Sequence, residues 1–323
     1  MSRVQPPAAR LSARPRARGF SLIEMMIGLA LGLTLVAGVS VVFLTSAGGQ
    51  RSAETNTVMQ TSGQYAIEAL RFELLHSGFD SFNGSDASQV IGAVNVANDC
   101  LVGFSTNLGQ RLWAANDQNP FAGSCVPSSA YLKGDVVAFR RASLARPAAL
   151  DANRLHARIA FEGASLFQGA AAPANGFIPF EDRRMEASVY FISPYTASPS
   201  ENPRVPALYR VRLVPGPAIS APELVASGIE DLQIEIGVRD ATGSIIFVDP
   251  NEVAPAAVTA ATTGITEWNS VLAARVHVLV RSERTETGYK PGPRTYQLGS
   301  RSVTVSDSFR REVQTSVVQL RNS

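Results

Sequence analysis

Cysteine and histidine are scarce in this chain of 323 residues, which has two of the first and three of the second. Cys100 and Cys125 are not in a CxxC arrangement and have no histidine near them in sequence, so their spacing does not indicate a metal site. His76, His156 and His277 lie far apart with no HExxH motif, and no GxSxG motif marks a serine nucleophile. We therefore expect structural or surface histidines and predict no catalytic site, metal or cofactor.

Acidic residues are absent from the first 19 positions, which carry five arginines (Arg3, Arg10, Arg14, Arg16 and Arg18). These arginines supply +5 of the formal charge, whose total is +2, so the remaining chain carries −3. No basic stripe interleaved with aromatic residues follows, and the composition gives no support for nucleic-acid binding.

Charge is also nearly absent from the next stretch, Phe20 to Leu44, where Glu24 is the single charged residue in 25 positions. As a helix rising ~1.5 Å per residue, this run is about 37 Å long. It can cross a hydrocarbon core of ~30 Å with some tilt. By the positive-inside rule the arginine-rich end stays in the cytoplasm, so the chain after the run is exported.

Glu24 is the unusual residue of this run. A carboxylate inside a membrane-spanning helix costs about 2.5–3.5 kcal/mol on insertion scales, and such residues usually have a functional partner. The alternative is that Glu24 lies near the interface and extends its carboxylate towards the headgroups, which lowers the cost.

The sequence from Gly19 to Glu24 resembles the processing site of type IV prepilins. In that family a basic leader ends in Gly, an aromatic residue follows, and Glu is the fifth residue of the mature chain. The resemblance implies cleavage between Gly19 and Phe20 by a prepilin peptidase, methylation of the new Phe20 amine, and pairing of Glu24 with the terminal amine of a neighbouring subunit. A conventional secretory signal peptide would have a shorter apolar core and a small-x-small cleavage site, for which Ala47-Gly48-Gly49 is a poor candidate.

Export also bears on the two cysteines. An oxidising compartment favours a disulfide over free thiols, so we predict a Cys100–Cys125 bridge. In the chain-entropy model, closing that loop stabilises the fold by about 3 kcal/mol.

The helix is expected to continue beyond the apolar run. Residues 50–75 contain no proline, and Met59, Ala66, Leu70 and Leu74 fall on one face at helical spacing, together with Ile67. This amphipathic face should pack on a globular domain, and Gly78 is a plausible stop signal.

From residue 135 onwards the hydrophobic period changes to two, which is typical of strands. Turns rich in Pro and Gly separate these strands with no helix between them, which favours an antiparallel sheet. We predict an α+β fold in four parts: a removed leader (1–19), a long helix (20–78, membrane-spanning over 20–44), a loop-rich segment with the disulfide (79–134) and a β domain (135–323). The expected strands cover 135–140, 154–161, 187–192, 207–214, 232–238, 276–280 and 309–320.

A second resemblance lies in the last third of the chain. Four segments are similar to PilW-type minor pilins: 74–79, 228–238, 268–282 and 309–322. This resemblance implies a structural subunit of the type IV pilus, placed near its tip with other minor and major pilins, that primes assembly and so supports adhesion, twitching motility or DNA uptake. Its implied partners are those pilins, the prepilin peptidase, the inner membrane and the pilus assembly machinery, and its implied location is the inner membrane and then the cell surface.

Two other hypotheses stay open. The N-terminal half fits a J-type minor pseudopilin of type II secretion equally well, and only the C-terminal resemblance favours the pilus. A membrane-anchored periplasmic enzyme or binding protein is the third hypothesis, and it has no need for Glu24.

Three further features have two interpretations each. The segment from Asp240 to Ser244 is better explained as a hairpin turn than as a Ca²⁺ loop, because it lacks the ligand density of an EF-hand. Trp113 and Trp268 are equally compatible with a buried core and with anchors for a partner.

Overall fold

The computed structural model describes residues 19–78, 88–101, 103–107, 110–161, 163–172, 179–253, 267–286 and 288–321. The expected leader, apart from Gly19, lies outside the described residues. The chain divides into two compact units, residues 1–54 and 55–323.

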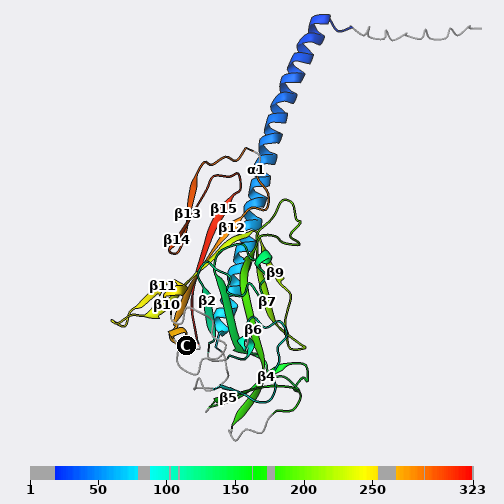
Figure 1. Cartoon of the computed structure of the whole chain (residues 1–323). Coiled ribbons are helices and arrows are strands. Elements are labelled where there is room, and N and C mark those ends of the chain that lie inside the picture. Colours follow the sequence, from blue (N-terminus) through cyan, green and yellow to red (C-terminus); the bar gives the residue numbers. More distant parts are fainter. Residues whose placement is uncertain are drawn as a thin grey trace, which may run out of the picture. The chain divides into compact units, whose positions relative to one another are not determined.

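A single long helix, α1 (Leu22–His76), runs through the described start of the chain (Figure 1). Its apolar residues up to Leu44 are exposed. In the second unit the helix buries one face, made of Met59, Gly63, Ala66, Leu70, Glu73 and Leu74. The helix ends at the predicted stop, where Gly78 adopts a positive φ of 72°.

The larger sheet has nine strands, with the order β1-β5-β4-β6-β3-β2 and with β7, β8 and β9 attached beyond β6. All its ladders are antiparallel except the pairing of β1 with β5. Its strands are β1 (Ser88–Val90), β2 (Leu112–Ala115), β3 (Val136–Ala142), β4 (Leu155–Ala160), β5 (Gly163–Gln168), β6 (Phe180–Ser193), β7 (Ala207–Val214), β8 (Ala218–Ile219) and β9 (Glu223–Ser227).

A second, antiparallel sheet has the order β11-β10-β12-β15, and a two-stranded ribbon pairs β13 with β14 (Figure 1). The strands of the sheet are β10 (Ile229–Arg239), β11 (Ile245–Val248), β12 (Ala273–Arg281) and β15 (Arg311–Gln319), and those of the ribbon are β13 (Arg294–Leu298) and β14 (Arg301–Val305). Short 3₁₀ turns, η1 (Phe104–Thr106), η2 (Ser128–Ala130), η3 (Pro250–Glu252) and η4 (Glu267–Ser270), connect some of these strands.

The hydrophobic core of the second unit lies between the buried face of α1 and both sheets. The alternating positions of β10 and β12, such as Leu232, Ile234, Val276 and Val278, join Leu70 of the helix in one cluster. A separate, smaller cluster lies among β4, β5 and the first half of β6, and it includes Leu155, Ile159, Leu166 and Met185. Burial of these side chains is the main driving force for folding, at ~25 cal/mol per Å² of apolar surface.

The predicted fold class is confirmed: a long N-terminal helix that is apolar in its first half, with antiparallel sheets after it. Each predicted strand has a counterpart, in β3, β4, β6, β7, β10, β12 and β15 respectively. The remaining strands were not predicted, because most are short and their sequences alternate weakly. The domain boundaries proposed from the sequence stay predictions.

Candidate functional site

The first candidate site is the start of α1. Gly19 and Phe20 lie outside the helix, and Phe20 is 80% exposed. Ser21 and Glu24 then form a reciprocal pair: the Glu24 N–H donates to Ser21 Oγ at 3.2 Å, and the Ser21 N–H donates to Glu24 Oε2 at 3.4 Å. This is a capping box, which satisfies two backbone donors at the helix N-terminus.

The capping box has two consequences. It begins the helix at Leu22, so the bond between Gly19 and Phe20 lies in accessible, non-helical chain. It also directs the Glu24 carboxylate back towards the preceding residues. The N-cap role of Ser21 was not predicted, although the spacing S-x-x-E from Ser21 to Glu24 indicates a capping box.

The first part of α1, on both sides of Glu24, is apolar and exposed along its length. Leu22, Ile23, Met25 and Met26 are each more than 60% exposed, and so are many of the apolar residues that follow them. By length and composition this part of α1 can cross a membrane. Exposed apolar surface of this extent marks a site of contact with lipid or with protein.

The second candidate site joins α1 to the larger sheet through a buried carboxylate. Glu73 is 7% exposed, accepts a hydrogen bond from the Tyr190 hydroxyl at 3.2 Å and lies 3.4 Å from Arg141 Nε. Arg141 also pairs with Glu186, at 2.5 Å. Burial and the neighbouring Glu73 charge raise the pKa of Tyr190, so its hydroxyl stays a donor. Periodicity did not reveal Glu73, because a lone Glu on an apolar face gives no such signal.

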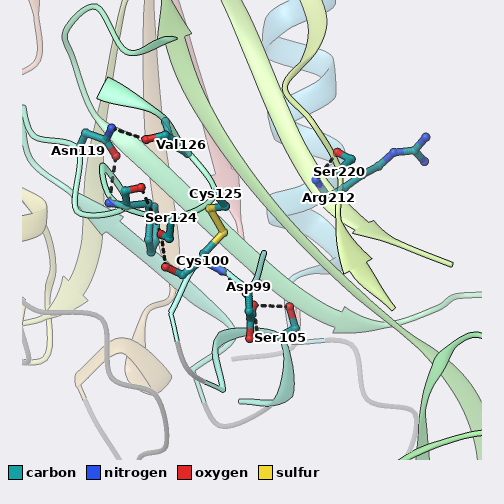
Figure 2. Close-up of a disulfide and its surroundings, with 10 residues drawn as sticks. Asp99, Cys100, Ser105, Asn119, Ser124, Cys125, Val126, Arg212 and Ser220 are labelled. Carbon is teal, nitrogen blue, oxygen red and sulfur yellow. Dashed lines mark hydrogen bonds between the residues drawn. A yellow bond between two sulfur atoms is a disulfide. The ribbon is translucent and has the colours of Figure 1, made fainter. Parts of the chain in front are cut away.

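The third candidate site is the disulfide loop (Figure 2). Cys100 and Cys125 are bonded and buried, and the Ser124 hydroxyl donates to the carbonyl of Cys100. The Asp99 carboxylate accepts hydrogen bonds from the Cys100 N–H at 3.0 Å and from the Ser105 hydroxyl at 2.8 Å (Figure 2). Burial raises the pKa of Asp99, and the hydrogen bonds from Ser105 oppose that rise. These contacts fix a segment that has little regular structure.

A buried arginine supports this loop from the core. Arg140 is 1% exposed, places its guanidinium 4.1 Å from the centre of the Phe104 ring and donates to the carbonyl of Gln110. Burial lowers the pKa of Arg140 to about 9, and the Asp99 carboxylate opposes the shift. The Arg140 guanidinium and the Asp99 carboxylate therefore link β3 electrostatically to the disulfide loop.

The three histidines have structural contacts. His76 bonds the carbonyl of Phe72 at 2.7 Å, and His156 is fully buried beside Phe167. His277 lies between Glu235, at 3.1 Å, and Thr315, at 2.9 Å. Within the described ranges, no group of three His, Cys, Asp or Glu side chains could hold a metal ion.

The remaining sequence features fall into the core and a turn. Asp240 Oδ1 accepts hydrogen bonds from the backbone of Thr242, at 2.8 Å, and of Ser244, at 2.9 Å, in the hairpin between β10 and β11. Trp113 and Trp268 are 1% and 2% exposed with ring centres 6.4 Å apart, so both belong to the core.

Comparison with known proteins gives two family matches. Residues 189–322 match the family model described as Type IV Pilus-assembly protein W, and residues 14–40 match the Prokaryotic N-terminal methylation motif. A type IV-like pilin from Thermus thermophilus is similar in structure, with a TM-score of 0.33 and 14% identity over 84% of this chain and 97% of that chain. No curated protein matches the sequence.

The methylation-motif match contains Gly19, Phe20 and Glu24, and the match to the pilus-assembly family begins within β6 and extends through β15. The two matches contain the prepilin-like site and three of the four PilW-like segments, 228–238, 268–282 and 309–322, whereas 74–79 lies outside both. The two matches support a type IV pilin-like protein with a PilW domain over residues 189–322.

Proposed function

We propose that the chain is a minor pilin that is incorporated near the tip of a type IV pilus and primes its assembly. The observation that carries the proposal is the combination of a PilW match over 189–322 with a methylation motif over 14–40. The chain has no catalytic role in this proposal and acts as the substrate of a prepilin peptidase. Adhesion, twitching motility or DNA uptake would follow from the assembled pilus.

The proposed sequence of events begins at the accessible bond between Gly19 and Phe20. The peptidase removes the basic leader and leaves a new amine on Phe20. An α-amino group has an ordinary pKa of ~7.7–8.0, so this amine is mostly protonated at neutral pH. It remains a cation after methylation. Glu24 supplies the opposite charge to the amine of a neighbouring subunit in the membrane. Pairing lowers the cost of holding both charges away from water.

The topology in this proposal places the five leader arginines in the cytoplasm and the second unit in the periplasm. The disulfide supports this placement, because such bonds persist in oxidising compartments. The partners are other minor and major pilins together with the assembly machinery of the inner membrane.

The first test is the N-terminal residue of the protein recovered from membranes, measured by mass spectrometry with and without the prepilin peptidase. We expect an N-methylated Phe20 that is lost in the strain without the peptidase. An intact Met1, or a start near Gly49, would overturn the proposal and leave an anchored or secreted domain.

The second test replaces Glu24 with Gln, which keeps the size and removes the charge. We expect a stable protein that is absent from sheared pili, because its pairing with a neighbouring amine is lost. The matched control is Glu54→Gln, an exposed glutamate of the same helix, which should be incorporated normally. Incorporation of the Glu24 variant at the wild-type level would favour an anchored enzyme or binding protein.

A minor pseudopilin of type II secretion is separated by a genetic test. Deletion of the gene should abolish surface pili and leave the export of secreted enzymes intact. The reverse result would assign the chain to secretion, even if Phe20 is methylated.

A further inference from the structure

A half-open polar cavity of about 510 Å³ lies beside the disulfide loop. This volume is within the range of ~300–1,000 Å³ that is typical of small-molecule sites. The cavity belongs entirely to the second unit, and its polar lining comes from Asn95, Asn98, Asp99, Thr106 and Ser124.

The walls of the cavity are held in place by contacts described above. The Cys100–Cys125 bond joins the wall that contains Asn98 to the wall that contains Ser124. Asn98 adopts a positive φ of 54°, and Asp99 accepts hydrogen bonds from its own loop. A ligand would therefore meet a preorganised surface, which lowers the entropy cost of binding.

The lining excludes several classes of ligand. Of the described residues that line the cavity, none is a Lys, Arg or His, so a phosphate or another anion would contact no cationic side chain there. Asp99 is the single carboxylate among the described lining residues, whereas Ca²⁺ takes six to eight oxygen ligands. Apolar side chains are limited to Val94 and Val96 in the described lining, which is too little for a hydrophobic ligand.

The class that fits is a neutral molecule rich in hydroxyl groups. The exposed amides of Asn95 and Asn98 each offer donors and an acceptor, and the Asp99 carboxylate adds acceptors. Sugar hydroxyls donate and accept at the same time, so they match such a mixture. Gly103 and Gly123 also line the cavity, where the lack of a side chain lets a ligand approach the backbone.

We propose that this cavity, bounded by the disulfide loop, binds a neutral saccharide through the side chains of Asn95, Asn98 and Asp99. The proposal does not rest on the pilin function: an unprocessed chain would contain the same cavity. A saccharide at this position would give the exposed second unit a capacity for recognising glycans.

The test is ligand-observed saturation-transfer NMR on the full chain in a zwitterionic detergent without a sugar headgroup. The probes are maltose, cellobiose, lactose and N,N′-diacetylchitobiose, with glucuronic acid and inorganic phosphate as charged comparisons. We expect at least one neutral disaccharide to give a saturable signal, and the two charged probes to give none. Absence of signal from all four disaccharides, or a stronger signal from phosphate, would overturn the proposal.

Two variants locate the site. Asn98→Gly removes the amide and keeps the positive φ that glycine favours, and Asn95→Ala truncates an exposed side chain. Loss of one hydrogen bond should lower the affinity about 2- to 10-fold in each. Asn56→Ala, an exposed change on α1 away from the cavity, is the matched control and should bind as the wild type does. Unchanged binding in the variant that combines Asn98→Gly with Asn95→Ala would place the sugar elsewhere and refute the assignment.

Discussion

Gly228 connects β9 to β10 at a point where two backbones come very close. Its φ is +73°, and a Cβ built on it would lie 2.8 Å from the carbonyl oxygen of Arg281. The Arg281 N–H donates to the Gly228 carbonyl at 2.7 Å, so neither strand can move away without losing this bond. Replacement by alanine therefore adds both a strained φ and a steric overlap.

The two costs can be separated with a second glycine. Gly243 also has a positive φ, +89°, but a Cβ there meets nothing within 4 Å. Gly243→Ala should therefore lower the free energy of unfolding by about 1–2 kcal/mol, the cost of the left-handed conformation alone. Gly228→Ala should lower it by about 2–5 kcal/mol, because overpacking adds roughly 1–3 kcal/mol.

Chemical denaturation of the full chain in detergent, followed by tryptophan fluorescence, measures both variants. Trp113 and Trp268 are buried in the core of the second unit, so their emission reports its unfolding. Equal losses in the two variants would refute the steric argument. A smaller loss for Gly228→Ala than for Gly243→Ala would contradict both the steric argument and the cost assigned to the positive φ of Gly228.

Three further predictions concern the same unit. Replacing both Cys100 and Cys125 with Ser should lower the free energy of unfolding by about 3 kcal/mol. A reducing agent should destabilise the wild type but not the variant. Equal sensitivity of the two proteins to the reductant would contradict a stabilising role of the disulfide. Glu73→Ala should cost about 3–5 kcal/mol because it breaks the buried pair of Glu73 with Arg141, whereas the exposed Glu68→Ala should cost less than ~1 kcal/mol. Similar losses in denaturation would argue against a stabilising role of the Glu73–Arg141 pair. Burial raises the pKa of Asp135 well above its ordinary value of 3.8, so the contribution of Asp135 to stability is full below pH 3.8 and is lost as the pH rises through the pKa in the folded state. Over this pH range the denaturation midpoint of the wild type should fall more steeply than that of Asp135→Asn. Parallel pH profiles would contradict the raised pKa of Asp135.

The helix and the longer strands were predictable because their signals are local. The apolar run and the stripe through Leu70 and Leu74 each repeat over several turns. The strict alternation from Leu232 to Val238 likewise marks β10. Binary patterns of this length leave little choice of secondary structure.

The short strands and the buried contacts of Glu73 were not predictable because they depend on distant partners. β5 is a strand because it pairs with β4 on one side and β1 on the other. Glu73 is buried because Tyr190 and Arg141 approach it from the sheet, and neither is near it in sequence. The polar cavity likewise requires the disulfide to bring its two walls together.

The length of β6 has a consequence for how this architecture can vary. Its first residues, Phe180 to Arg184, pair with β4, whereas from Met185 onwards it pairs with β3. The pilus-assembly match begins at residue 189, after this change of partner. The β4–β5 pair thus joins β6 through its first residues only, and it packs in a small core separate from the main one. A change in the length or sequence of the β4–β5 pair would leave the ladders of β6 with β3 and β7 in place, so this pair is where the surface can vary at the lowest structural cost.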